Sequence, residues 1–247
     1  MAFLVFDFET TGLQPGHHEP IQVAALLLDG DMDEVGVFES LIRPLRPEAA
    51  SPEALAVNGR SLSDLAGEPH PVEVLGKFVD FACAAGEPVV MVGHNVGFDL
   101  EFLRREEATY GLALPRHDGA IDTCSLARVH LEALGAIANS RLATVAAHYG
   151  IGFQAHDALG DVRATARILE KFKGEAPVLV NRAIDGTLLS GLLADAEAAQ
   201  PGSPFVASVS GQYSQKGWLS PKQISALVRI TAEEAAGDRR DAVAMRS

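Results

Sequence analysis

The stretch FLVFDFETTGL, residues 3–13, decides the fold class, because an apolar run ends here in two carboxylates set one residue apart. In a β-strand successive side chains point to opposite faces, so Asp7 and Glu9 share one face while Phe6 and Phe8 share the other. Two like charges held this close repel each other. The sequence therefore predicts an apolar strand whose end carries negative charge that something else must compensate.

The whole chain of 247 residues, 47% of them hydrophobic, is large enough for one sizeable domain or for a domain with an appendage. We find neither an apolar run of about 18 residues nor a cationic leader, so we expect a cytoplasmic protein without a membrane span. The two cysteines lack a C-x-x-C spacing and indicate reduced thiols. The formal charge of -13 argues against coating a polyanion by bulk electrostatics, but it is compatible with handling a phosphate through metal ions.

The order of the expected elements indicates an α/β fold with a mixed sheet. Alternating and apolar runs predict three consecutive strands near residues 3–7, 20–29 and 35–43. Strands and helices then alternate. The expected helices lie near 51–59, 71–85, 98–111, 141–150 and 157–174, with one strand ending at Gly93 and another running into a helix over 119–131. Three strands followed by this alternation predict an α/β domain over residues 1–173.

The character of the chain changes after residue 173. Residues 174–204 are rich in Ala and Leu and end in the linker-like QPGSP, so we expect a connecting segment. Residues 205–247 are expected to form a small, mostly helical C-terminal module.

That module has an unusual charge pattern. In a chain with 33 acidic residues, no Asp or Glu occurs between residues 198 and 232. Cations and aromatic residues occur there instead: Tyr213, Lys216, Trp218, Lys222 and Arg229. This pattern has three interpretations, which the sequence leaves open. The cations and rings contact a nucleic-acid strand, Trp218 anchors a protein partner, or the aromatic residues pack on themselves.

Two further stretches place acids as the first one does. Asp99, in HNVGFDLEFL, follows a buried strand and falls in the first turn of a helix, where the macrodipole favours an anion. Asp161, in HDALGD, follows His156 by five positions, which is about 140° on a helix. The two therefore share a face only if His156 precedes the helix. Taken singly, each stretch has an ordinary structural interpretation as a solvated edge, a helix charge or a capping histidine.

Taken together, these stretches place four carboxylates and one histidine at strand ends and helix starts, where α/β folds build their sites. An all-oxygen cluster suits Mg²⁺ or Mn²⁺ rather than zinc. Two such ions, with His156 as general base, form an arrangement suited to phosphodiester hydrolysis.

The motifs FDFETTGL, HNVGFD and HDALGD resemble, in order and spacing, the three exonuclease motifs of the DnaQ-like, or DEDDh, 3'-5' exonucleases. This family includes the proofreading epsilon subunit of bacterial DNA polymerase III and ribonuclease T. AIDTCSLAR and LATVAAHYGI resemble its connecting segment. The resemblance covers about residues 3–173 and implies a ribonuclease H-like mixed sheet flanked by helices.

The resemblance also implies a role for each site residue. In the family, four acids hold two Mg²⁺ or Mn²⁺ ions, and the first acid bridges both. The residues that match these acids are Asp7, Glu9, Asp99 and Asp161. His156 matches the general base. Residues expected to bind the substrate are Thr10, Thr11, Gly12, Leu13, His94 and Asn95. Ordinary core packing is the alternative for Leu13, and a structural hydrogen bond is the alternative for His94 and Asn95.

The function implied is metal-dependent 3'-5' hydrolysis of single-stranded DNA with release of nucleoside 5'-monophosphates, in proofreading or repair. The motif FETTG resembles the corresponding motif of the DNA-proofreading and ribonuclease T branches more than that of the oligoribonucleases. Trimming of RNA 3' ends is the first alternative. The second is a module that recruits a replication or repair partner and whose nuclease activity is secondary. By analogy with the C-terminal extension of the epsilon subunit, the C-terminal module is expected to bind a DNA polymerase or another replication or repair protein.

Overall fold

A mixed β-sheet organises the computed structural model, which describes residues 1–152, 157–216, 219–220 and 222–232. Within these residues the sheet has five strands in the order β3-β2-β1-β4-β5. β1 pairs antiparallel with β2 and parallel with β4, β2 pairs antiparallel with β3, and β4 pairs parallel with β5. This topology confirms the predicted α/β class. The strands are β1 (Ala2–Thr10), β2 (Pro20–Leu28), β3 (Glu34–Leu41), β4 (Val89–Gly93) and β5 (Arg116–Asp122).

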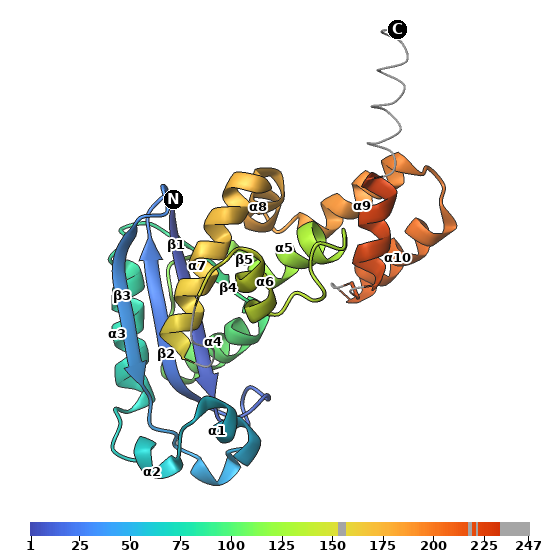
Figure 1. Cartoon of the computed structure of the whole chain (residues 1–247). Helices are drawn as coiled ribbons and strands as arrows, with labels where there is room; N and C mark the ends of the chain where they lie inside the picture. The colour runs from blue at the N-terminus through green and yellow to red at the C-terminus, as the bar shows by residue number, and fades with distance from the viewer. Residues whose placement is uncertain (153–156, 217–218, 221, 233–247) are drawn as a thin grey trace, which may run out of the picture.

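Helices cover both faces of the sheet (Figure 1). They include short elements that connect the longer helices, and residues 222–232 are helical as well. The helical elements are η1 (Pro47–Ala49), α1 (Pro52–Asn58), α2 (Leu62–Leu65), α3 (Pro71–Cys83), α4 (Val96–Tyr110), α5 (Thr123–Ala127), the π-helical η2 (Arg128–Glu132), α6 (Leu142–His148), α7 (Ala158–Glu175), α8 (Pro177–Ile184), α9 (Leu188–Ala199) and α10 (Pro204–Lys216).

The alternation of side chains along β1 creates two separate cores. Leu4, Phe6 and Phe8 pack on one face with residues of α3 and α4. Phe3 and Val5 pack on the opposite face with residues of α5, α6, α7 and α8. Because strand residues alternate, Asp7 and Glu9 continue the face that α7 covers. The apolar strand thus fixes the direction in which the two carboxylates point.

Helix α1 is anchored to the end of β1. Both ends of the helix are capped: Ser51 Oγ accepts the N–H of Ala54, and Gly59 ends the helix in the left-handed conformation. The backbone N–H of Ser51 donates to the carbonyl of Thr11 at 2.8 Å. At the other end of the helix, Asn58 Nδ2 donates to the carbonyl of Thr10 at 2.9 Å. These bonds hold α1 beside the turn that follows the paired acids.

The segment expected to connect the two parts is itself helical. Val180 and Ala183 of α8 belong to the core on the α7 face of the sheet. A Cβ added at Gly119 of β5 would lie 1.8 Å from the carbonyl oxygen of Ile184, so the end of α8 lies directly on β5. Residues 177–184 therefore form part of the layer that covers the sheet.

The predicted helical appendage is confirmed and has a core of its own. α9, α10 and residues 222–232 form this C-terminal unit, which extends to one side of the sheet (Figure 1). It meets the rest of the chain at Val129 of η2. Its buried residues are Leu192, Leu193, Ala196, Val206, Val209, Leu219, Ile224, Leu227 and Val228. The division at residues 173 and 204 stays a prediction, although the packing groups α9 with α10.

The predictions made for His156 and Trp218 lie outside the described residues. Ser220 Oγ accepts the N–H of Gln223 at 3.4 Å, as expected for a residue that begins a helix. No helix among the described residues is long and apolar enough to cross a membrane.

Candidate active site

Three of the predicted acids meet at one end of the sheet. Oxygen atoms of Asp7, Glu9 and Asp161 all lie within 4.8 Å of one another. Asp7 and Glu9 come from β1, and Asp161 comes from the first turn of α7. Helix α7 begins at this place because the carboxylate of Asp157 accepts the N–H of Gly160 at 3.2 Å and caps its first turn. The cap directs Asp161 toward the end of β1.

The fourth acid, Asp99, supports β1 from the other side. Strand β4 pairs with β1 only as far as Val5, so the N–H of Phe8 needs another acceptor. Asp99 Oδ1 accepts this N–H at 3.0 Å, and the Asp99 side chain is only 3% exposed. Asp99 lies in the first turn of α4, as predicted. The fourth acid therefore binds the backbone between the two acids of β1.

Ionising this cluster is costly. Burial, and after it the charges of Asp99, Glu9 and Asp161, raises the pKa of Asp7 well above its usual value. Burial and Asp161 raise the pKa of Glu9 to about 7, although the guanidinium of Arg60 opposes the shift. Burial raises the pKa of Asp99 to about 7, with Glu9 adding to the effect. A bound cation would remove this cost, because it compensates charges that repel one another.

The donor set fits a hard divalent cation. Three carboxylates converge within the reach of one ion, and all their donor atoms are oxygen. Asp99, bound to β1, is fixed next to them. The arrangement can therefore hold metal at the end of β1.

The turn after β1 is held by its own threonines. Thr10 Oγ1 donates to the carbonyl of Gly12 at 2.8 Å, and Thr11 Oγ1 accepts the N–H of Glu19 at 2.9 Å. Both threonines are buried. Substrate contact by Thr10, Thr11 and Gly12 stays a prediction, and the observed hydrogen bonds shape the turn that presents Leu13.

Leu13 protrudes into an apolar cavity. Its side chain is 79% exposed, so the alternative of ordinary core packing is wrong. The cavity has a volume of about 530 Å³. It is lined by Leu13 with Phe8, Phe98 and Val57, and it reaches Glu9 of the acid cluster. We refer to it as the apolar cavity.

His94 and Asn95 have different roles in the structure. A carbonyl can only accept, so His94 Nε2 donates to Ser140 O at 2.8 Å, and Nδ1 lies 2.9 Å from Thr123 Oγ1. Burial lowers the pKa of His94, which favours the neutral ring. The side chain of Asn95 is exposed instead, and its backbone adopts a positive φ of 73°. For His94 the structural hydrogen bond is present; substrate contact by either residue stays a prediction.

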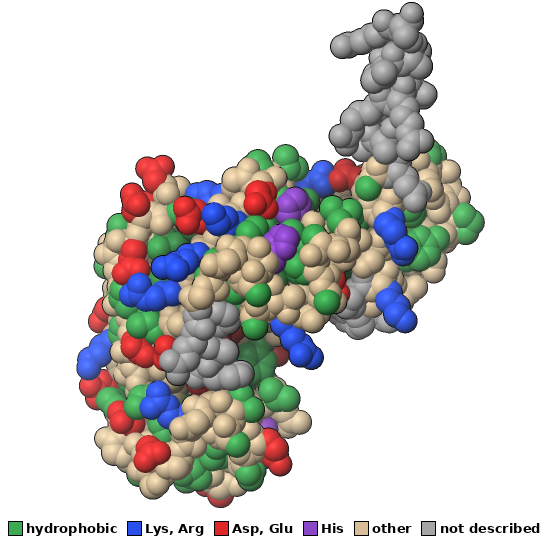
Figure 2. Space-filling view, in the orientation of Figure 1, with side chains coloured by type: hydrophobic (Ala, Val, Ile, Leu, Met, Phe, Trp, Pro, Cys, Tyr) green, Lys and Arg blue, Asp and Glu red, His purple; other side chains and the backbone are tan. Residues whose placement is uncertain are grey.

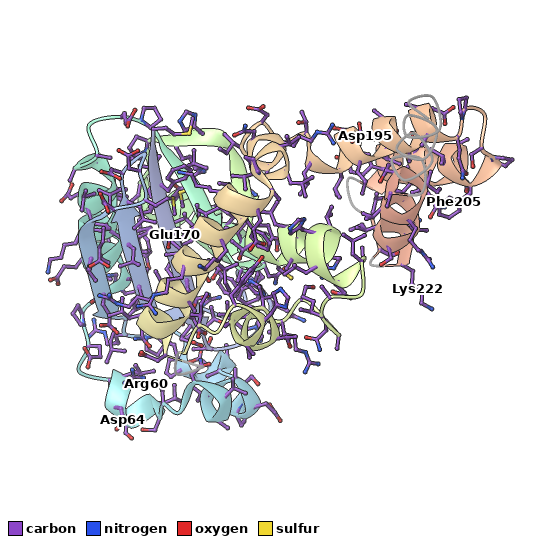
Figure 3. The ribbon with its side chains drawn as sticks, turned by 45° about the horizontal axis from the view of Figure 1, so that its top comes forward. Arg60, Asp64, Glu170, Asp195, Phe205 and Lys222 are labelled. Atoms are coloured by element: carbon purple, nitrogen blue, oxygen red, sulfur yellow. The ribbon has the colours of Figure 1, made fainter. Side chains whose placement is uncertain are left out.

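Two residues near the site were missed by the sequence analysis. A Cβ added at Gly12 would overlap the ring of His18, so His18 packs directly against the turn. Its Nδ1 accepts the N–H of Gln14 at 3.0 Å. Arg60, which follows α1 (Figure 3), is the cation that counteracts the pKa shift of Glu9. Neither residue belongs to a motif that could have identified it.

Comparison with known proteins agrees with this geometry. A family model described as "Exonuclease", RNase_T, matches residues 4–169. A DNA polymerase III subunit epsilon-like protein of Rhodobacter capsulatus is 37% identical over 189 residues, which cover 74% of this chain and 25% of that protein. A PolC-type DNA polymerase III of Thermotoga maritima is 34% identical over 173 residues, covering 69% of this chain and 12% of that protein. The chain thus spans a quarter or less of the length of these two relatives.

A solved structure shows the same fold. The crystal structure of E. coli exonuclease I in complex with a dT13 oligonucleotide superposes with a TM-score of 0.63 and 23% sequence identity. The match covers 73% of this chain and 42% of that chain.

Proposed function

Because this chain belongs to the RNase_T exonuclease family, that is, to the DnaQ-like exonucleases, we propose that it is a metal-dependent 3'-5' exonuclease. The substrate is the 3' end of single-stranded DNA, the product is a nucleoside 5'-monophosphate, and the process is proofreading or repair. One observation carries the proposal: the acid cluster of Asp7, Glu9 and Asp161 borders an apolar cavity into which Leu13 protrudes. The cavity offers a place for a terminal base beside the carboxylates that would hold metal.

The proposed cofactor is a pair of Mg²⁺ or Mn²⁺ ions. Asp7, Glu9, Asp99 and Asp161 would hold them. When bound, such ions activate a water molecule and stabilise the leaving oxygen of a phosphodiester. The raised pKa values of Asp7, Glu9 and Asp99 support this assignment, because cations compensate the repulsion that burial strengthens.

The residues of the chain position the reacting groups. Leu13 and the apolar wall around it hold the terminal base and so fix the position of the bond to be cleaved. The water oxygen attacks phosphorus, and the bond to the 3' oxygen of the preceding nucleotide breaks. That oxygen keeps the electron pair and takes a proton, so the shortened strand ends in a 3'-hydroxyl. His156, as general base, accepts the proton of the attacking water.

The preference for DNA has indirect support. The relatives are named as parts of DNA polymerase III, and the solved exonuclease I was bound to an oligothymidylate. Trimming of RNA remains the main alternative. The choice between DNA and RNA depends on whether the site accommodates a 2'-hydroxyl. We further propose that the protein works in the cytoplasm and that the C-terminal unit binds a DNA polymerase or another replication or repair protein.

A degradation ladder tests the proposal. Single-stranded DNA and RNA of the same sequence, labelled at the 5' end, are incubated with the full chain and Mg²⁺, Mn²⁺ or a chelator. His156→Ala is run beside His148→Ala, which removes an exposed histidine at the end of α6. We expect metal-dependent shortening of DNA from the 3' end that only His156→Ala slows strongly.

The other outcomes separate the alternatives. A ladder on RNA alone would assign the protein to RNA processing. The absence of a ladder on both substrates, from a protein with a cooperative melting transition, would overturn the enzyme hypothesis and favour a recruiting module.

A further inference from the structure

A second cavity lies at the same edge of the sheet as the acids and is separate from the apolar cavity. It has a volume of about 560 Å³ and is lined by Asn95, after β4, and by Cys124, after β5. Since β1, β4 and β5 run parallel, their ends lie at the same edge of the sheet. Both cavities therefore flank the acids along this edge, where the molecule is hollowed between α1 and α6 (Figure 2).

The second cavity differs from the first in charge. Arg128 and Arg141 line it, together with a single acid, Glu132. Among the described residues neither arginine forms an ion pair. Within the part of the chain that the structure describes, the Arg128 side chain donates to Cys124 Sγ at 3.7 Å, and its buried Nε finds no acceptor there. Two guanidinium groups that pair with no carboxylate of the described residues thus line one cavity, which we refer to as the cationic cavity. An anion is the ligand that such groups bind.

The wall that carries Arg141 is rigid. His94 Nε2 and Cys124 Sγ both donate to the carbonyl of Ser140, at 2.8 Å and 3.4 Å. The backbone N–H of Arg141 donates to Asn139 Oδ1 at 3.1 Å. These bonds tie the loop before α6 to the ends of β4 and β5. Arg141 is therefore held at a fixed place relative to the acids, while its own side chain is exposed.

Asn95 completes the wall nearest to the acids. It has a positive φ of 73°, an uncommon conformation for a residue other than glycine. Asp122 Oδ1 holds it there by accepting its N–H at 2.7 Å. Its side chain does not cap α4, and it is exposed at the cavity instead. Such backbone strain is often found where a side chain is directed to a ligand.

We propose that the cationic cavity binds phosphate groups of the nucleic-acid strand on the 5' side of the bond to be cleaved. The inference rests on the proposed exonuclease function. If the terminal nucleoside occupies the apolar cavity, the scissile phosphate lies at the acids and the strand continues toward Arg141 and Arg128. The site then accounts for how a chain of net charge -13 retains a polyanion.

Binding and kinetics across a length series test the proposal. The substrates are thymidine oligonucleotides of two, four and eight residues, labelled at the 5' end, and the variants are Arg141→Ala and Arg141→Lys. Arg167→Ala is the matched control, because it removes an exposed arginine of α7 that lines a different cavity. Binding is measured by fluorescence anisotropy in chelator, and KM is measured with metal.

We expect Arg141→Ala to raise Kd and KM for the octanucleotide about fivefold, the effect of one hydrogen bond of about 1 kcal/mol. The effect for the dinucleotide should be smaller. The slope of log Kd against log salt should become shallower by about 0.7 for each phosphate group that the variant no longer binds. Arg141→Lys should lose less affinity than Arg141→Ala, and Arg167→Ala should leave length and salt dependence as in the native chain.

Two results would overturn the proposal. One is a ratio of variant to native KM or Kd that is the same for all three oligonucleotide lengths. The other is an unchanged slope of log Kd against log salt. Because anisotropy needs no turnover, a protein that binds the octanucleotide through Arg141 but does not cleave it would refute the exonuclease function while retaining this site.

Discussion

The end of β1 and the C-terminal unit are built on opposite principles. At the end of β1, buried or half-buried Asp7, Glu9, Asp99 and Asp161 face one another, and their repulsion raises pKa values. In the C-terminal unit, α9, α10 and residues 222–232 bury an apolar core. The rest of the fold must hold the first arrangement in place, whereas the second is stabilised by its own packing. The difference indicates that the end of β1 is a functional site, because groups that lower stability are kept there for their chemistry.

The largest expected effect comes from removing the central charge. Asp7→Asn should lower the exonuclease rate about 1,000-fold, because the variant loses a carboxylate that would hold the metal ions. It should also raise the melting temperature of the metal-free protein, because a repelling charge is gone. Both are measured on one preparation, by single-turnover cleavage and by calorimetry.

Asp80→Asn is the control for this prediction, since Asp80 is exposed on α3, away from the acids. It should change neither quantity. A variant Asp7→Asn that cleaves at the native rate would refute the role of the acid cluster.

Substitutions at two glycines test how tightly the sheet and the C-terminal unit are packed around them. Gly119→Ala should destabilise the protein by about 2 to 3 kcal/mol, because the new methyl group overlaps the carbonyl of Ile184. Gly211→Ala, at an exposed position of α10 with no atom near the added Cβ, should stabilise that helix by about 0.5 to 1 kcal/mol. Urea denaturation of both variants measures the difference. Equal effects would mean that α8 does not rest on β5 as described.

The sequence predicted what depends on local patterns. The alternation over β1 predicted which way Asp7 and Glu9 point, and the position of Asp99 after a buried strand predicted a first-turn acid; both are confirmed. The motifs also predicted the family. These features are local, since a strand period or a helix cap is written in a few neighbouring residues.

What the sequence did not predict depends on contacts between distant segments. Arg60 lies near Glu9 only because the segment after α1 returns to the end of β1. His18 packs on Gly12 because the loop between β1 and β2 folds back on itself. Ser140 accepts a hydrogen bond from His94, 46 positions earlier, and so places Arg141 beside the site. Nothing in the local pattern around Arg60 or Arg141 indicates these contacts, because arginines are common in surface segments of any protein.

Leu13→Ala should have a moderate effect that is confined to substrate binding. Because the protruding side chain is proposed to contact the terminal base, its loss should raise KM about tenfold while stability changes little. Leu45→Ala is the control, since Leu45 is also an exposed leucine but does not line the apolar cavity. Steady-state kinetics on the octanucleotide and melting curves measure the two quantities. A large loss of stability would show that Leu13 belongs to the core after all.

The smallest expected effect is a pH dependence of stability in the metal-free protein. Glu9 and Asp99, each with a folded pKa of about 7, keep protons that their unfolded counterparts release near pH 4. The folded state therefore binds more protons between about pH 4 and pH 7, and stability must fall as pH rises through that window. Glu53, Asp64 and Glu73 have lowered pKa values, so their contribution to the pH dependence falls below this window.

Scans at pH 5, 6, 7 and 8, with and without Mg²⁺ or Mn²⁺, measure this dependence. Without metal the melting temperature should decline toward pH 8, and the gain on adding metal should be larger at pH 8 than at pH 6, because cations bind the ionised carboxylates. The variant Asp99→Asn distinguishes the contribution of Asp99 to this pH dependence from that of Glu106, whose pKa is also raised by burial. The variant keeps an oxygen that can accept the N–H of Phe8, so a flatter pH profile would arise from the lost charge. A profile as steep as that of the native chain would show that Asp99 does not contribute to the pH dependence.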